Sequence, residues 1–545
     1  MNWGGTPWGG GPWGGGPLVD GALPAPFEVH LEQLDREDVY RLEAYPRIAS
    51  GTKVLVEYTD VEWIGKPMIP ATLRRAVEFQ GSVPSLFGSS AGGSPQFGAI
   101  EIVANTFETS EGLDLAFLSA LDWHGAVVRM RMGAPDFSYE QFQPVFGGRA
   151  IDMIRNARGF EIVIGDPSIA LNVPMQTETY LGTGGVEGDA RVKGQYRPWG
   201  EGVVTGSQPV LIDRVNGIWQ YNLEESASFD ALMEDGRAGG WIRDADVPDI
   251  FASAAPAGGH YHVEDPAGGR SFMKTGGNAT QLGAMTCHFT GVRTTAADIV
   301  EHVSRQFAGQ VNSDFDLPSF AQLNIDYPYP IGIFTGQSNP TVSQVVRQIM
   351  GGSEPVGVPL GFHTWDRLGR MRVGVHKQRP AVRTIYADQI ASVRREQTVG
   401  AFWSWGLGYA PNWTVIAPDA VSPAASAAEF DFATLDFRRI EPAVDLVVKG
   451  NKDLPNSIVL NTLLANEADA DTVAAQALAL SSASRDLHEL EVYDHQYLIG
   501  GGDTVEVDAG VPDAGHDLQA GDYLALGHGE SSQTKRTQLL LWGPL

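Results

Sequence analysis

Cysteine is almost missing from this chain of 545 residues, in which Cys287 is the single thiol. One thiol cannot form an intramolecular disulfide, so a secreted fold stapled by disulfides is excluded. A zinc site with four cysteine ligands is excluded for the same reason. Basic side chains are also few, with 38 Lys and Arg against 66 Asp and Glu, which gives a formal net charge of −28. A charge of that sign repels nucleic acid and anionic lipid, so we expect no specific nucleic-acid binding.

Long apolar runs and targeting signals are missing as well. No run of about 18 apolar residues occurs, so the sequence predicts no transmembrane helix and no membrane insertion by this chain. The first residues lack a basic segment followed by an apolar one, so we expect no secretory signal and predict synthesis in a cytoplasm. The chain exceeds the roughly 250–300 residues at which a single core stops growing, so we expect several modules.

The N-terminal residues 1–17 (MNWGGTPWGGGPWGGGP) are dominated by glycine and carry Trp3, Trp8 and Trp13 at a regular spacing. Glycine at this density cannot bury enough surface to offset its backbone entropy, so we expect a flexible arm. Two interpretations stay open. The segment is a low-complexity tail, or it is an arm that becomes ordered when its indoles dock on a neighbouring subunit.

Short segments rich in β-forming residues recur along the rest of the chain, separated by clusters of Gly, Pro and Ser. Such segments predict strands and turns. An Asn-Gly pair before one of them is typical of a hairpin turn. The predicted strands cover residues 52–58, 127–132, 160–164, two parts of 203–212, 216–222, 487–498, 504–508, 523–526 and 538–542, with loops and short strands over 252–283.

Three segments have the apolar spacing of helices. Thr295 is placed to cap a helix whose apolar residues follow at intervals of four. Residues 341–350 repeat this pattern. The longest candidate is 469–485, with acidic residues at its start and Arg485 at its end, which the helix dipole favours. Because strands outnumber helices, the sequence predicts a mainly β, α+β chain of small β-barrel or sandwich-like modules with a few isolated helices.

This organisation suggests five parts. They are a Gly/Trp/Pro-rich arm (1–17), an N-terminal β-rich domain (18–180), an inserted β module (181–290), an α+β domain (291–400) and a C-terminal β domain with one long helix (401–545).

Two motifs could carry chemistry. Residues 88–92 match the G-x-S-x-G pattern around Ser90, which a hydrolase places on a strand-to-helix turn. Pro and Ser surround this segment and no helix follows, so a loop is the preferred interpretation. His260 and His262 would share one face of a strand and could bind one metal ion. His288, Glu264 and Asp265 lie further along the chain, but none is placed as a third ligand, so polar loop histidines are preferred.

The remaining candidates have simpler explanations. Asp469 and Asp471 lack the glycine and glutamate of a calcium-binding loop and fit a helix N-terminus. Residues 182–188 are rich in glycine but lack the lysine of a phosphate-binding loop, so they indicate turns. The sequence therefore predicts no catalytic residue, no cofactor or cofactor-binding residue and no metal ligand, and a protein that is not an enzyme.

A resemblance to a known group is carried first by residues 191–221 (RVKGQYRPWGEGVVTGSQPVLIDRVNGIWQY). This segment resembles one that recurs in siphophage and prophage tail-tip proteins, as do the strand-like residues 99–105, 112–114 and 127–133 before it. The residues that match the recurring pattern are Gly194, Arg197, Pro198, Gly200, Gly202, Pro209, Leu211, Asp213 and Tyr221.

Two later regions add to the resemblance. Residues 324–375 contain paired prolines before Gly332, a short helix and the segment LGRMRVG, and they resemble the small domain before the C-terminal part of such hubs. The segment 405–413 (WGLGYAPNW), the acidic helix after it and the closing residues 538–543 (QLLLWG) are similar to the end of tail-tip and baseplate hub proteins, including those of phage-like gene transfer agents.

The resemblance implies a structural virion protein, the baseplate hub of a siphophage-type tail tip. Such proteins form a ring, commonly a trimer, that closes the tail tube, carries fibres and serves host attachment and DNA ejection. The implied partners are further copies of this chain and the distal tail, tail tube, tape measure and fibre or receptor-binding proteins. The implied location is the virion, after synthesis in the bacterial host cytoplasm. The net charge adds the hypothesis of an acidic channel along which DNA slides.

Two other functions are weighed against the hub. A receptor-binding tail protein would present exposed aromatic loop tips, for which Trp403 and Trp405 are the candidates. A tail-borne hydrolase of cell wall or polysaccharide would need a cleft with paired carboxylates or a zinc centre.

Overall fold

The computed structural model describes residues 39–48, 50–59, 73–75, 78–82, 96–97, 100–103, 119–156, 159–264, 269–277, 282–451, 456–493, 495–508, 518–531 and 534–545. The predicted arm over residues 1–17 and the Ser90 motif lie outside these residues. Within the described part, no helix is long and apolar enough to span a bilayer.

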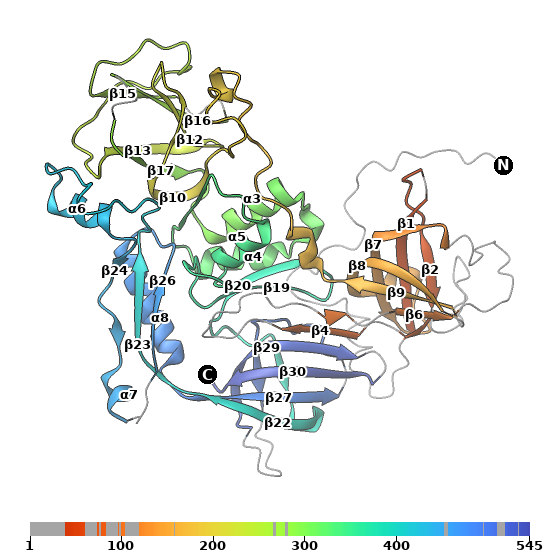
Figure 1. The fold of residues 1–545 in the computed structure, drawn as a ribbon. Helices are drawn as coiled ribbons and strands as arrows, with labels where there is room; N and C mark the ends of the chain where they lie inside the picture. The colour runs from red at the N-terminus through yellow and green to blue at the C-terminus, as the bar shows by residue number, and fades with distance from the viewer. Residues whose placement is uncertain are drawn as a thin grey trace.

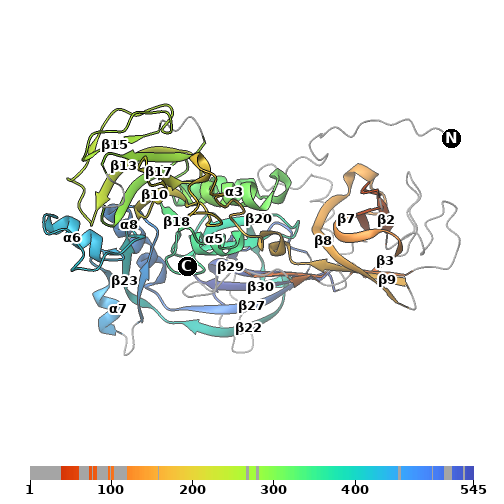
Figure 2. The ribbon, with the colours of Figure 1, turned by 45° about the horizontal axis from the view of Figure 1, so that its top comes forward.

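An antiparallel seven-stranded sheet forms one end of the molecule (Figures 1 and 2). In β7, alternate side chains such as Val128, Met130 and Met132 face the core, as expected for a strand with one buried face. The sheet has the order β2-β1-β7-β8-β9-β6-β3, with β1 (Val39–Arg47), β2 (Val56–Thr59), β3 (Leu73–Arg75), β6 (Ile100–Val103), β7 (Asp122–Gly133), β8 (Gln143–Asn156) and β9 (Gly159–Gly165).

Two smaller sheets pack together at the opposite end (Figure 1). The four-stranded sheet has the order β13-β17-β10-β18, with β10 (Trp199–Ser207), β13 (Ser226–Glu234), β17 (Met285–Gly291) and β18 (Gly332–Gly336). The five-stranded sheet has the order β11-β12-β16-β15-β14, with β11 (Val210–Asp213), β12 (Ile218–Asn222), β14 (Ile242–Arg243), β15 (His260–Val263) and β16 (Ser271–Thr275). Their facing sides share one core around Tyr221, Phe229, Met273 and Phe289, so they form a sandwich-like unit.

A layer of helices lies between these two ends (Figure 1). It contains α3 (Ala296–Ala308), α4 (Leu317–Asp326) and α5 (Val342–Ile349), which pack with the hairpin of β19 (Gly361–Trp365) and β20 (Met371–Val375). Thr295 accepts the hydrogen bond that starts α3, as predicted, and Thr341 does the same for α5. Helix α4 was not predicted, because its apolar residues follow no strong helical period.

The C-terminal part contributes two sheets. The first is centred on β23 (Phe402–Tyr409), which is covered by α8 (Glu467–Ser481) and flanked by α6 (Ala427–Thr434), β24 (Arg438–Arg439), β25 (Ala443–Val444), α7 (Leu446–Asn451) and β26 (Asn456–Asn461). The second has the order β21-β28-β29-β30-β27-β22, with β21 (Arg383–Ile385), β22 (Ile390–Val399), β27 (Arg485–Tyr493), β28 (Thr504–Val507), β29 (Gly521–Ser531) and β30 (Arg536–Gly543).

Strand β4 (Glu78–Ser82), from the N-terminal region, extends this last sheet by pairing with β29, and β5 (Gln96–Phe97) pairs with β4. Strand β18 likewise pairs with β10, although helices α3 and α4 lie between the two strands in the sequence. Strand pairing therefore crosses the five predicted parts, whose boundaries stay a proposal. The mainly β, α+β fold class is confirmed, and in the described residues the modules are open sheets and not closed barrels.

The boundaries of three predicted elements are wrong. The long helix begins at Glu467 and ends at Ser481, and Arg485 instead opens β27. The guanidinium of Arg485 still donates to the carbonyl of Leu480, so it serves the helix end from the next strand. The strand predicted over 487–498 ends at Tyr493, and the one predicted over 52–58 is confined to β2. Helices α6 and α7 were not predicted.

Candidate functional site

Arg197, from the segment that carries the family resemblance, is a buried cation held by its two Nη atoms, while its Nε lies 3.6 Å from Glu178 Oε2. Its side chain is 1% exposed. Its Nη1 donates to the carbonyl of Val186 at 2.8 Å, and its Nη2 donates to Glu187 at 2.8 Å. The guanidinium lies 4.6 Å from the centroid of the Tyr180 ring. Arg197 thus fastens the glycine-rich turn 182–188 to the sandwich-like unit, a structural role.

Two further residues of the same segment shape its backbone. Gly202 has a φ of +78°, and a Cβ there would lie 1.9 Å from the carbonyl oxygen of Ile331, so only glycine fits. Asp213 accepts hydrogen bonds from the backbone N–H groups of Val215 (2.9 Å) and Asn216 (3.0 Å), which closes the predicted hairpin between β11 and β12. These residues build the fold and offer no reactive group.

The two histidines of the H-x-H motif share one face of β15, as predicted. His260 Nδ1 lies 2.9 Å from Asp244 Oδ1, and His262 Nε2 lies 3.4 Å from Asp244 Oδ2. The third partner that the sequence did not place is therefore Asp244, which lies in the loop after β14. All three side chains are partly exposed, and they form a polar surface cluster.

The other residues considered with this motif lie elsewhere. His288 packs its ring against Phe432 at 5.0 Å, and burial lowers the pKa of His288 to about 4. Burial raises the pKa of Glu264. Asp265 lies outside the described residues. Asp469 stands in the first turn of α8, as predicted.

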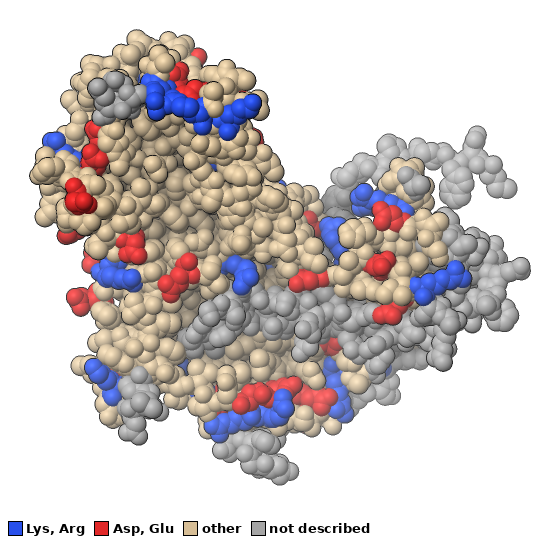
Figure 3. Space-filling view, viewed as in Figure 1, with Lys and Arg blue, Asp and Glu red and all other residues tan. Residues whose placement is uncertain are grey.

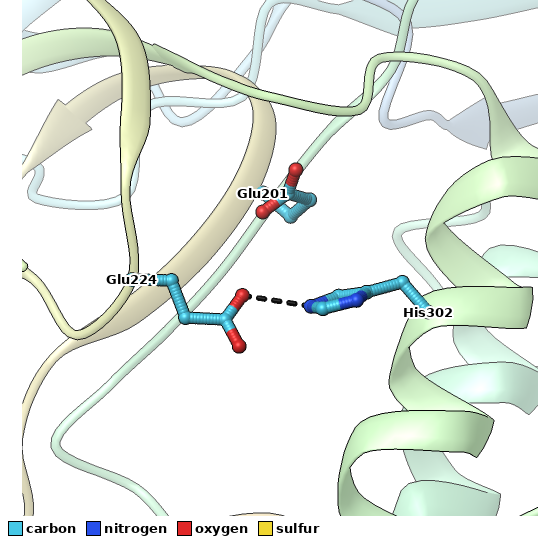
Figure 4. Close-up of side chains that lie close together, drawn as sticks. All are labelled: Glu201, Glu224 and His302. Carbon is cyan, nitrogen blue, oxygen red and sulfur yellow. Dashed lines mark hydrogen bonds and ion pairs between the residues drawn. The ribbon is translucent and has the colours of Figure 1, made fainter. Parts of the chain in front are cut away.

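Residues that the sequence analysis did not single out form a second cluster, in which Glu201, Glu224 and His302 meet (Figure 4). Glu201 lies on β10, Glu224 on the turn between β12 and β13, and His302 on α3. One oxygen or nitrogen atom from each lies within 4.8 Å of the other two. His302 Nε2 is 2.7 Å from Glu224 Oε2 across 78 residues of sequence, so no local motif could have indicated the cluster.

Glu201 is the buried member of this cluster. Its side chain is 0% exposed, and its Oε2 has no hydrogen-bond partner. Its Oε1 accepts from the backbone N–H of Arg293 at 2.6 Å, and the Arg293 guanidinium lies 3.6 Å away. Burial raises the pKa of Glu201, and the contacts with Arg293 oppose that rise. The cluster can hold either a shared proton or a cation.

A third polar group joins the N-terminal and C-terminal sheets. Tyr40 Oη and His495 Nε2 are hydrogen-bonded at 2.9 Å, and His495 Nδ1 lies 2.7 Å from Glu530 Oε2. His528 Nε2 lies 2.9 Å from Glu530 Oε1, which also accepts from the backbone N–H of Gln496. This buried network fastens β1 to β29.

Two cavities lie beside elements of the C-terminal and N-terminal parts. One of about 340 Å³ opens beside α8 and is lined largely by apolar side chains, together with Arg485 and Lys377. Its carboxylate, Asp326, is paired with Lys377 and Arg379. The other, of about 100 Å³, lies between the seven-stranded sheet and the helical layer. Neither contains the Glu201–Glu224–His302 cluster.

The single thiol, Cys287, is expected to be unreactive in the folded protein. It is fully buried on β17, and burial raises its pKa to about 12, so almost no thiolate exists at pH 8. A colorimetric disulfide reagent should label no cysteine in native buffer and one cysteine per chain in guanidinium chloride. Rapid labelling of the native chain would contradict this placement.

The aromatic residues expected as exposed loop tips lie in a strand. Both Trp403 and Trp405 belong to β23. Trp405 is buried, and its Nε1 donates to Ser481 on α8 at 2.8 Å. Trp403 is half-buried and stacks beneath the ammonium of Lys449 at 4.0 Å. The expectation of exposed tips is therefore wrong for both residues.

Comparison with known proteins gave matches among solved structures, whereas no family model and no curated protein matches the chain. The 43 kDa tail protein of prophage MuSo2 from Shewanella oneidensis is similar over 93% of this chain and 99% of its own, with 10% identity and a TM-score of 0.35. A tail protein from Neisseria meningitidis MC58 is similar over 92% of this chain and 96% of its own, with 10% identity and a TM-score of 0.34. A chain of a native gene transfer agent virion is similar over 65% of this chain and 85% of its own, with 10% identity and a TM-score of 0.35. These three structures are two tail proteins and a gene transfer agent particle.

Proposed function

We propose that this chain is a structural virion protein of a phage-type tail tip, and more narrowly the baseplate hub that closes the tail tube and anchors fibres or receptor-binding proteins. The observation that carries the proposal is the 191–221 segment. The residues on which its resemblance to tail-tip proteins rests, such as Arg197, Gly202 and Asp213, serve the fold of one β module. A protein built for assembly needs such rigid surfaces more than reactive groups.

An exposed apolar face supports assembly. Leu446 and Val447 on α7 and Val459 on β26 are 69%, 70% and 61% exposed, and both elements contact β23. Val444 on the neighbouring β25 is also exposed. Apolar side chains grouped in this way are typical of a surface that another subunit covers. We call these four residues the β23 face and assign it to contact with a second copy in a homotrimer.

The surface charge agrees with protein contacts. Among the described residues on the side drawn in Figure 3, Lys and Arg lie close to Asp and Glu in small groups of mixed charge. An acidic channel, as the net charge of −28 suggested, would have to be formed by other surfaces.

The experiment is a cryo-EM map of tails that contain the full chain, combined with variants of the β23 face. Leu446→Asp and Val459→Asp should lower incorporation into tails by about tenfold or more, because each buries a charge at the contact. Val215→Asp is the matched control, since Val215 is 93% exposed on the hairpin between β11 and β12. A monomeric chain without neighbours in the map would sink the hub proposal, and equal incorporation of all three variants would remove the β23 face from it.

Catalysis is not part of this proposal. The Glu201–Glu224–His302 cluster has carboxylates, but Glu201 is fully buried and neither cavity reaches it. The purified chain should release no sugar or peptide from peptidoglycan or polysaccharide, and His260→Ala should assemble like the parent. Release of product by the parent chain would favour a tail-borne hydrolase instead.

A further inference from the structure

We propose that Glu201, Glu224 and His302 bind one divalent transition-metal ion, with Zn²⁺ as the reference ion, which fastens helix α3 to the β module. The sequence predicted no metal ligand. These three residues could not be grouped from the sequence, because they come from separate elements. The site is independent of the hub proposal, since a metal ion can be structural in any folded chain.

The ligand set is the first argument. Two carboxylates and one imidazole offer their atoms within 4.8 Å of one another. Around a single ion at about 2.0–2.2 Å, ligand atoms lie roughly 3–4 Å apart, so small side-chain rotations bring the three into place. In Figure 4 the three groups converge on one gap from different elements. A mixed oxygen and imidazole set favours Zn²⁺ or its neighbours over Mg²⁺ and Ca²⁺, which prefer oxygen alone.

The unsatisfied carboxylate of Glu201 is the second, independent argument. This side chain is fully buried, yet its Oε2 has no hydrogen-bond partner. A buried oxygen without a partner is costly, and a cation in the gap beside Glu224 and His302 would satisfy it. The opposite oxygen, Oε1, would keep its bond from the backbone of Arg293. That bond orients the carboxylate, as supporting contacts around metal ligands do.

The surrounding packing holds Glu201 in this position. A Cβ added at Gly291 would lie 2.9 Å from Glu201 Cδ, so position 291 on the neighbouring strand β17 needs a glycine. His302 is positioned by α3 and lies edge-on to Phe307, with ring centroids 6.4 Å apart. Glu224 and His302 are partly exposed, which gives an ion a path from solvent. Three protein ligands leave one coordination position for water.

The test uses the full chain, stripped with a chelator, reloaded with Zn²⁺ and desalted before elemental analysis. The parent should retain about one ion per chain. Glu224→Gln and His302→Gln should retain at least about tenfold less, because each variant loses a ligand but keeps a similar shape. His260→Gln is the matched control: it changes a histidine that also faces a carboxylate, but in the exposed cluster with Asp244. It should bind like the parent.

A second measurement needs no variant and so does not depend on folding. Zn²⁺ should protect His302 of the parent chain from acylation by diethylpyrocarbonate, as followed by mass spectrometry, while His260 reacts at the same rate with and without the ion. A parent chain that retains no Zn²⁺, or equal acylation of His302 in both states, would overturn the proposal. So would loss of the ion in His260→Gln together with its retention in His302→Gln.

Discussion

Replacement of Glu530 by Gln should destabilise the contact between the two terminal sheets by about 3–5 kcal/mol, the range measured when one partner of a buried ion pair is removed. Glu530 is buried and accepts from the side chains of His495 and His528 and from the backbone of Gln496. A neutral amide cannot accept from both rings, so the network loses its charge and part of its hydrogen bonding.

The effect should depend on pH with a defined sign. Burial alone would raise the pKa of Glu530, but the hydrogen bonds from His495 and His528 reverse this and lower it to about 2, from an ordinary 4.5. A lowered folded-state pKa stabilises the fold above the ordinary value, and this contribution disappears as the pH falls. The stability difference between the parent and Glu530→Gln should therefore be full above about pH 4.5 and shrink as the pH approaches 2.

Denaturant unfolding, with hydrogen exchange resolved along the chain, measures both effects. Exchange should accelerate most in β1 and around residues 495–499, because Tyr40 joins the two regions through His495. The matched control is Glu506→Gln, an exposed glutamate on β28 in the same sheet, which should change stability by no more than about 0.5 kcal/mol. If Glu530→Gln is as stable as this control, or if the difference grows on acidification, the network does not hold the sheets together.

Local features of the fold could be predicted from the sequence. Thr295 was identified as a helix cap because a cap is decided by residues within one turn. The hairpin closed by Asp213 was identified because an Asn-Gly pair favours a tight turn through its own backbone conformation, without distant contacts. The helix now seen as α8 was found but extended too far, since the short loop between Ser481 and Arg485 contains neither glycine nor proline.

Contacts between distant residues could not be predicted. Tyr40 and His495 are 455 positions apart, and Glu224 and His302 are 78 apart, so no spacing rule applies to either pair. The H-x-H motif was visible, but its partner Asp244 became identifiable only when β14 was seen beside β15. A period of two or 3.6 residues predicts which face of an element is buried, and it does not predict which element covers that face.

Arg197→Met, within the segment that resembles tail-tip proteins, should lower the stability of the β module by about 3–5 kcal/mol. Methionine fills a similar volume but donates no hydrogen bond. The carbonyl of Val186 would then lose its donor, and Tyr180 would lose the cation beside its ring. Glu187 Oε2 and Gln220 Oε1 would lose the guanidinium but keep the N–H of Leu181 and the hydroxyl of Tyr180 as donors. Loss of the buried cation from its pair with Glu187 accounts for most of the expected loss.

The same segment contains the control. Arg191 pairs with Asp189 on the surface, and exposed ion pairs contribute little, so Arg191→Met should change stability by no more than about 0.5 kcal/mol. Urea unfolding compares the two variants, and hydrogen exchange over residues 180–222 shows whether the loss is local. The turn 182–188 should exchange fastest in Arg197→Met, because Glu187 and Val186 are the groups that Arg197 holds. Equal stability of the two variants would mean that the contacts of Arg197 do not hold the β module together.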